Sequence, residues 1–116
     1  MPKIKRFEPG PRMSQAVRHG DTIYLAGQVG TGANITEQTE SALAEVERLL
    51  ELAGGSKASI LSVTVWLADM GDFAAMNAAY DAWVDPENKP ARATGEAKLA
   101  TPDYLVEFIV VAARVK

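Results

Sequence analysis

The sequence predicts a two-layer α+β domain in which two amphipathic helices cover one face of a mixed β-sheet. Two segments carry apolar residues at helical spacing, and segments with strand-like alternation or β-branched composition lie before, between and after them. A helix with one apolar stripe buries that stripe against another layer, and a sheet provides it. The 116 residues leave room for one core, so a single domain is expected over residues 1–116.

The N-terminal part is predicted to contain a turn followed by two short strands. Two prolines and a glycine in "EPGPR" (residues 8–12) indicate the turn. The next segment, "SQAVRHGDTIYLAGQVG", has a second turn at His19-Gly20-Asp21. The strand after that turn is expected over residues 22–26, which are rich in residues that favour extended backbone.

The first helix is predicted within "NITEQTESALAEVERLLELAGG". Asn34 is a candidate N-cap because Glu37 follows three positions later, and Gly54 with Gly55 is expected to end the helix. The apolar stripe consists of Leu43, Val46, Leu49, Leu50 and Ala53.

A central strand and a second helix are predicted next. In "SILSVTVWLADM" the alternation places Leu61, Val63, Val65 and Leu67 on one face, and Ile60, Ser62, Thr64 and Trp66 on the other. The second helix, in "DFAAMNAAYDAWVD", is expected to end at Asp85-Pro86 because the residue before a proline avoids helical backbone. Its stripe is predicted to be Phe73, Met76, Tyr80 and Trp83 or Val84, and its aromatic residues are expected to serve the core.

The last two strands are predicted over roughly residues 91–99 and 104–115. The final strand is apolar on both faces, with Val106, Phe108, Val110 and Ala112 on one and Leu105, Ile109, Val111 and Ala113 on the other. Two helices cover only one face of the sheet, so other copies of the same chain are expected to cover the second face. The sequence therefore predicts a homo-oligomer.

Composition argues against several classes of function. A formal charge of −3 gives no strong attraction to nucleic acid or to anionic membranes. The chain has no cysteine, which removes disulfides, thiol nucleophiles and cysteine-based zinc sites. No apolar run suits a signal peptide or a membrane span, so a cytoplasmic protein is expected, with neither nucleic acid nor membrane as a partner.

Arg92 and Glu107 are the residues that point most clearly to chemistry. Arg92, in "NKPARATGEAKL", lies between two alanines of a predicted strand, although a guanidinium is always charged and costly to bury without an anionic partner. Glu107 interrupts one apolar face of the last strand. A structural ion pair forms if the two strands pair antiparallel. Surface placement and a catalytic or ligand-binding role are the other interpretations.

Five segments of the chain occur in the order and spacing of one known family, over nearly its whole length. They are "GDTIYLAGQVG", "QTESALAEVERLLELAGGS", "VTVWLADMGDFAAMNAAYDAWV", "KPARAT" and "VEFIVVAA". The most specific element is "PAR" followed by a "VE" strand close to the C-terminus. This arrangement resembles the RidA (YjgF) family of small trimeric imine/enamine deaminases.

The resemblance implies a chorismate-mutase-like fold, with a six-stranded mixed sheet, two helices on one face, and a homotrimer whose sheets form a central barrel. It implies ligand clefts between subunits and chemistry that requires neither a metal nor an organic cofactor. Arg92 would hold the substrate carboxylate through two parallel hydrogen bonds, and Glu107 would position or activate the attacking water. The implied activity is that of a 2-iminobutanoate/2-iminopropanoate deaminase. It hydrolyses 2-aminoacrylate, through its 2-iminopropanoate tautomer, to pyruvate and ammonia.

Three positions depart from the family pattern. Met13 stands where the well-studied deaminases have a tyrosine, Thr94 where cysteine is frequent, and Ala26 where serine is frequent. Gln15 and Asn77 remain, so the resemblance implies that Met13, Gln15, Asn77 and Thr94 contact substrate together with the arginine. A substrate with a larger or more apolar side chain is one consequence of Met13, and loss of efficient deamination is another.

The sequence is therefore compatible with four functions. The first is a deaminase of 2-imino acids, with a small imino or keto acid as its partner molecule. The second is a non-catalytic module that binds a 2-keto acid or a related carboxylate. The third is an endoribonuclease, which the negative charge and the lack of a histidine pair disfavour. The last is a structural trimer without a ligand.

Overall fold

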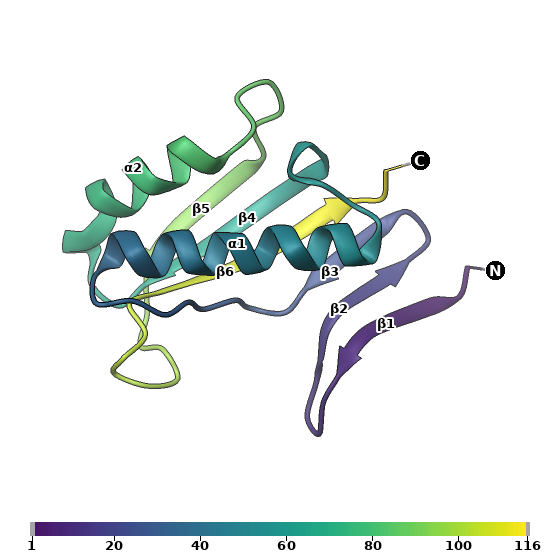
Figure 1. Ribbon diagram of the computed structural model, residues 1–116, viewed down its shortest axis with the longest axis horizontal. Coiled ribbons are helices and arrows are strands. Elements are labelled where there is room, and N and C mark those ends of the chain that lie inside the picture. The colour runs from purple at the N-terminus through teal and green to yellow at the C-terminus, as the bar shows by residue number, and fades with distance from the viewer. Residues whose placement is uncertain (1, 116) are drawn as a thin grey trace.

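A computed structural model describes residues 2–115, which form one six-stranded mixed sheet with both long helices on the same face (Figure 1). The strands are β1 (Ile4–Pro9), β2 (Ser14–His19), β3 (Thr22–Leu25), β4 (Ile60–Leu67), β5 (Ala91–Glu96) and β6 (Val106–Ala113). The helices are α1 (Ile35–Ala53) and α2 (Phe73–Trp83), with short 3₁₀ turns at Lys57–Ser59 and Met70–Asp72. The predicted fold class is confirmed.

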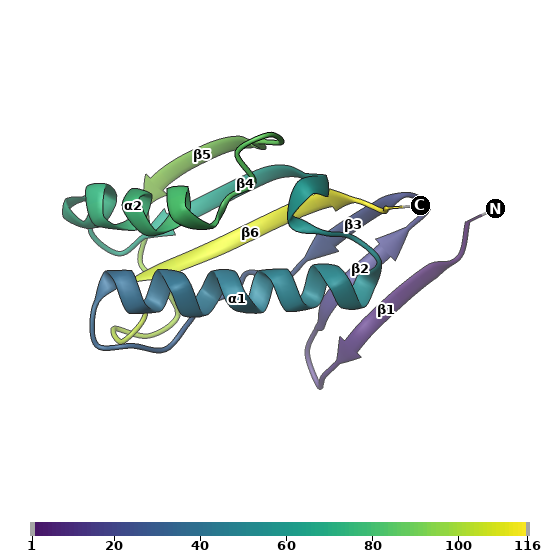
Figure 2. The same cartoon turned by 45° about the horizontal axis from the view of Figure 1, so that its top comes forward.

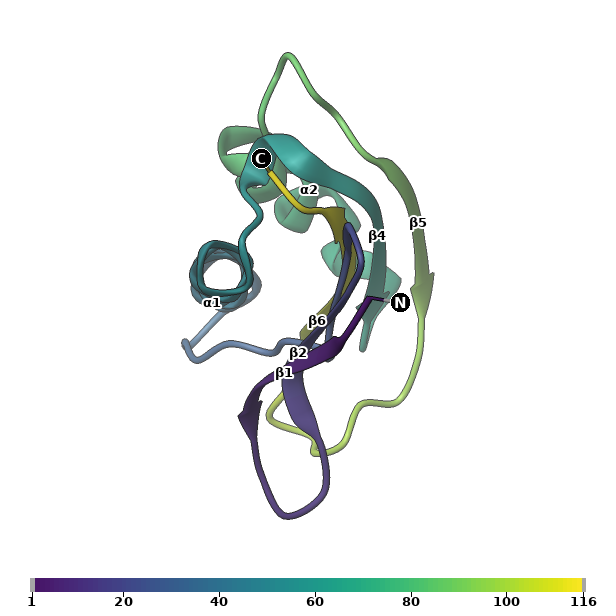
Figure 3. The same cartoon turned by 90° about the vertical axis from the view of Figure 1, so that its right-hand side faces the viewer.

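The strand order is β1-β2-β3-β6-β4-β5. Strand β5 runs parallel to β4, and α2 forms the crossover between them, whereas all other neighbours are antiparallel. Figures 2 and 3 show the sheet curving around the helices, with its second face uncovered by any element of the described chain.

Helix α1 begins and ends at the predicted residues. The Asn34 side chain accepts a hydrogen bond from the Glu37 backbone N–H at 2.9 Å, and the Glu37 carboxylate accepts one from the Ala33 N–H at 2.8 Å. Gly54 follows the last turn with a φ of 99°, a left-handed conformation in which a side chain is strained. The whole predicted stripe of α1 is buried.

The core lies between the helices and one face of β6, β4 and β3. On β6 the residues facing the helices are Val106, Phe108, Val110 and Ala112, each no more than 1% exposed. On α2 only Met76 and Tyr80 are buried, and Phe73 is 39% exposed, so the predicted stripe of this helix is too wide at its start.

The start of β4 corrects the predicted alternation. A β-bulge between Ile60 and Ser62 shifts the register, so Ile60 is buried and Leu61 is 53% exposed, the reverse of the expectation. From Val63 onward the predicted alternation is confirmed. Strand β1 was absent from the residue-based prediction because its exposed residues surround a single buried one, Phe7.

The second face of the sheet carries apolar side chains that remain accessible. Tyr24 is 50% exposed and Trp66 is 36% exposed, and on β6 the residues Ile109 and Val111 are only partly buried. Burial of this face by other copies of the chain remains a prediction.

No helix among residues 2–115 is both long and apolar enough to span a membrane.

Candidate functional site

Arg92 lies on the helix-covered face of the sheet, at one edge. In the parallel β4–β5 pairing it sits opposite Val63, which belongs to the core. Its guanidinium carbon lies 4.8 Å from the centre of the Tyr80 ring on α2, within the range of a cation–π interaction. The cation is thus partly buried against an aromatic face and not against a carboxylate.

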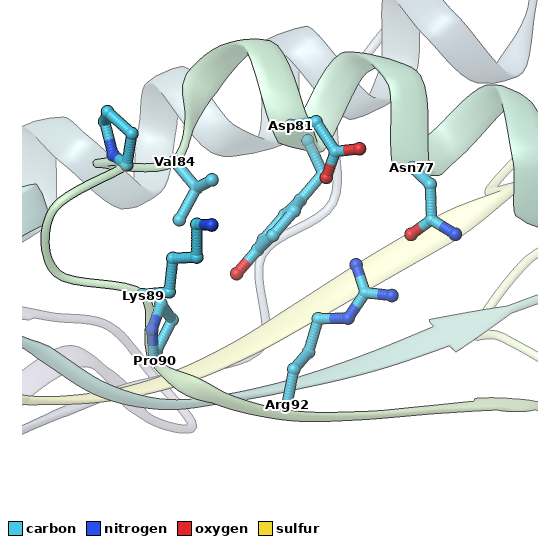
Figure 4. Close-up of a pocket in the computed structure, with 8 residues that line it drawn as sticks. Asn77, Asp81, Val84, Lys89, Pro90 and Arg92 are labelled. Atoms are coloured by element: carbon cyan, nitrogen blue, oxygen red, sulfur yellow. The ribbon is translucent and has the colours of Figure 1, made fainter.

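The Arg92 side chain projects into a cavity of about 580 Å³ between α2 and the segment that leads into β5. The cavity is lined by Asn77, Tyr80, Asp81, Val84, Pro86, Lys89, Pro90 and Arg92. In Figure 4 the guanidinium points toward α2, between Asn77 and Asp81. A volume in this range suits a small organic ligand.

The electrostatics of the cavity favour an anion. Lys89 and Arg92 contribute positive charge and Asp81 a negative one, yet within residues 2–115 neither cation forms a salt bridge. Arg92 also donates no hydrogen bond to another described residue. Burial raises the pKa of the Tyr80 phenol and outweighs the opposing effect of the Arg92 charge, so the ring beneath the cation stays neutral. The five N–H donors of the guanidinium remain available to a ligand.

Two buried polar atoms near Arg92 also lack partners among the described residues. They are Oδ1 of Asn77 and Oγ1 of Thr94. Asn77 lines the cavity, and Thr94 lies two residues after Arg92 on the same face of β5. Buried polar atoms are normally hydrogen-bonded, so these atoms mark positions where a ligand or water completes the site. Arg92 can therefore bind the carboxylate of a small molecule, while Asn77 accepts a hydrogen bond from an N–H group of the same molecule.

Glu107 is not part of this cavity. It lies opposite Trp66 in the β4–β6 pairing and alternates with Val106 and Phe108, so it faces away from the helices. Strand β4 separates β6 from β5. The interpretation of Arg92 and Glu107 as an ion pair within one chain is therefore wrong, because it required their strands to pair directly.

The Glu107 carboxylate packs closely over Gly27 after β3. A Cβ atom built on Gly27 would lie 2.2 Å from the Glu107 Oε2 atom and 2.8 Å from its Cδ atom. A side chain at position 27 would displace this carboxylate, so only glycine is compatible with its observed position. Gly27 therefore helps to define the position of the Glu107 oxygens on the second face of the sheet, the open face that the helices do not cover.

Met13 and Gln15 lie far along the strand order from Arg92, and neither lines its cavity. Met13 is in the β1–β2 connection and is 49% exposed. The Gln15 side-chain oxygen accepts a hydrogen bond at 2.9 Å from the buried side chain of Gln28. Within one copy the structure joins Asn77 and Thr94 to Arg92, and leaves Met13, Gln15 and Glu107 on other strands and connections.

Sequence reasoning missed two residues of the cavity that matter for its charge and shape. Tyr80 was assigned to the core alone, although it is three positions after Asn77 and so shares that residue's helix face. Lys89 lies three positions before Arg92, in the loop that closes the cavity.

Among the described residues no group of three or more acidic, histidine or cysteine side chains is arranged to hold a metal ion.

Comparison with known proteins gives consistent matches over the whole fold. The model of the family described as Endoribonuclease L-PSP matches residues 3–114. A RutC family protein from Haemophilus influenzae is 42% identical over 112 residues, covering 94% of this chain and 97% of that protein. The RutC family protein YoaB of Escherichia coli is 44% identical over 111 residues, covering 95% and 97%. The crystal structure of a YjgF family member from Neisseria meningitidis has a TM-score of 0.97 at 41% identity, covering 98% and 97%.

Proposed function

Since the chain belongs to the YjgF/RutC family and matches the Endoribonuclease L-PSP model, we propose that it hydrolyses reactive 2-imino acids to 2-keto acids and ammonia. The observation that carries the proposal is the Arg92 guanidinium, which faces a cavity of about 580 Å³ without a salt bridge among residues 2–115. A planar fork of N–H donors matches a planar carboxylate. Every 2-imino acid carries such a carboxylate beside its reactive C=N carbon.

The reaction needs only water as a second reactant. Water adds to the C=N carbon while the imine nitrogen takes up a proton, and the resulting carbinolamine expels ammonia as the C=O bond forms. Glu107 is assigned to accept a proton from the attacking water and to return it to the departing nitrogen. Asn77 is assigned to accept the imine N–H through its unpartnered Oδ1 atom.

This mechanism requires two copies of the chain, because Glu107 and Arg92 lie on opposite faces of one sheet. In the proposed assembly the open face of one copy, which carries Glu107, packs beside the Arg92 cavity of the next. The accessible side chains of Tyr24 and Trp66 on that face favour such packing. A cyclic trimer, as the resemblance to deaminases implies, repeats the composite site at each interface.

A second candidate is a binding module for 2-keto acids without turnover. It uses the same Arg92 anchor and needs no contribution from Glu107, and it is favoured by Met13 standing where deaminases have a tyrosine. The endoribonuclease named in the family description is disfavoured by the net charge of −3. Cleavage of RNA that survives Arg92→Ala would be independent of this site.

The proposal is tested with a panel of imino acids generated in place by an amino-acid oxidase, with semicarbazide trapping the imine that survives. Wild type should lower the trapped imine, Arg92→Ala should not, and Arg48→Ala should match wild type because Arg48 is exposed on α1 and does not line the cavity. If no imine in the panel is consumed, while 2-keto acids raise the Tm of wild type but not of Arg92→Ala, the binding module replaces the deaminase.

The composite site is tested by mixing two inactive variants. Arg92→Ala and Glu107→Gln are unfolded together, refolded and compared with each variant refolded alone. Random assembly leaves both intact residues at roughly a quarter of the interfaces, so activity should return to about that fraction of wild type. No recovery from mixed oligomers of the correct mass would contradict a site shared between copies.

A further inference from the structure

A second cavity, at the opposite edge of the sheet from Arg92, is lined largely by cations. It measures about 320 Å³ and is bounded by Pro2, Lys3, Lys5, Arg18, Gly20 and Arg114. Strand β1 forms one edge of the sheet and β5 the other. Figures 1 and 2 show the start of β1, the end of α1 and the segment after β6 at the same end of the molecule. The cavity is therefore separate from the proposed deaminase site.

The strands bring like charges together in this cavity. Lys5 and Arg18 are direct partners in the antiparallel β1–β2 pairing, an arrangement that normally destabilises a sheet. Both lie against the Phe7 ring, with the Lys5 Nζ atom 5.3 Å and the Arg18 guanidinium carbon 5.5 Å from its centre. Lys3 lies two residues before Lys5 and so extends the same face of the chain.

The neighbouring groups do not neutralise this charge. Within residues 2–115 none of the four cations forms a salt bridge. Arg18 donates a hydrogen bond at 2.5 Å to the carbonyl of Ala53, at the end of α1. A helix end carries only about −0.5 of a unit charge, which does not offset four cations. Asp21 lies in the adjoining turn, where its backbone carbonyl accepts a hydrogen bond at 2.8 Å from the Arg114 N–H.

We propose that this cavity binds an oligophosphate group, meaning two or more linked phosphates. Clustered arginine and lysine side chains bind phosphate oxygens well, and a single carboxylate would leave most of their mutual repulsion in place. The cavity volume of about 320 Å³ suits a short phosphate chain. The ligand is either an inorganic oligophosphate or the phosphate chain of a nucleotide whose remaining part lies outside.

Binding is measured by titration calorimetry at low salt with tripolyphosphate, ATP and AMP as probes. The test variant is Lys3→Gln with Lys5→Gln, which leaves Arg18 and its contact with α1 intact. The matched control is Arg12→Gln with Arg48→Gln, which removes the same charge from exposed residues that do not line the cavity. We expect saturable binding of tripolyphosphate to wild type and to the control. The test variant should bind at least about tenfold more weakly, as expected for losing two charged contacts.

An equal loss of tripolyphosphate affinity in both variants would mean that only net charge matters, and it would overturn the proposal. The absence of saturable binding to wild type would also overturn it. AMP binding as tight as that of tripolyphosphate would overturn the requirement for linked phosphates. Tighter binding of ATP than of tripolyphosphate identifies a nucleotide as the ligand, and the reverse identifies an inorganic chain. The Lys3→Gln, Lys5→Gln variant should keep the deamination rate of wild type, so the two proposals succeed or fail independently.

Discussion

The ring of Tyr80 on α2 supports the guanidinium of Arg92 on β5 at 4.8 Å, so the orientation of the anchor depends on the packing of a helix against the edge of the sheet. Tyr80 is only 6% exposed, and its fixed ring limits where the longer Arg92 side chain can move. A cation–π contact of this kind is worth about 0.5–2 kcal/mol. Tyr80 is therefore assigned as a positioning residue for the carboxylate anchor.

Replacing the ring should weaken substrate binding without slowing the chemical step. Tyr80→Leu removes the cation–π contact and should raise KM by roughly three- to thirtyfold while kcat stays close to wild type, because the carboxylate is bound alike in ground and transition states. Tyr80→Phe keeps the aromatic face and should restore KM. Steady-state kinetics on the best imino acid measure both, and a fall in kcat for Tyr80→Leu at unchanged KM would contradict the assignment.

The raised pKa of Tyr80 predicts a loss of stability in alkali. Burial raises this pKa above its ordinary value of 10.0, so the unfolded chain releases the phenol proton at a lower pH than the folded chain does. The contribution is fully present below pH 10 and declines as pH rises through the folded pKa. Urea unfolding of wild type and Tyr80→Phe at about pH 9 and about pH 11 should show a steeper decline for wild type. Parallel declines would mean that the phenol titrates alike in both states.

Gly27→Ala should displace the Glu107 carboxylate while leaving the fold intact. The new Cβ atom would lie 2.2 Å from Glu107 Oε2, and a flexible carboxylate moves more readily than backbone. We expect kcat to fall with little change in the binding of a keto acid, and unfolding free energy to change by less than about 1 kcal/mol. Gly10→Ala is the control, since its nearest contact would be the Met13 carbonyl at 3.6 Å. Wild-type turnover in Gly27→Ala would mean that the position of Glu107 is unimportant.

The open face of the sheet should be the interface between copies. Val111→Glu places a charge in the middle of that face and should dissociate the assembly, with loss of deamination because the composite site separates. Leu52→Glu is a matched control, since Leu52 is an exposed apolar residue of α1 at 47%. Light scattering gives the mass directly. A wild-type mass equal to the 12.4 kDa of one chain would refute both the interface and the shared site.

The sequence alone determined the elements whose signals are local. The spacing of apolar residues and the Asn34 and Gly54 caps located α1, since helix period and capping depend on residues a few positions apart. The alternation of β6 correctly separated its two apolar faces. Arg92 and Glu107 were identified as candidates because a charged residue within an apolar strand can be recognised from the sequence alone.

Only the tertiary structure decided how those residues relate in space. The insertion of β4 between β5 and β6, and the parallel pairing that places Arg92 opposite Val63, depend on contacts between segments distant in the sequence. The bulge that exchanges Ile60 and Leu61 depends on the register against β6. For the same reason Tyr80 supports Arg92 while Glu107 lies on the other face. The pairing partner of a strand fixes which way each side chain points, and nothing in a strand's own residues specifies that partner.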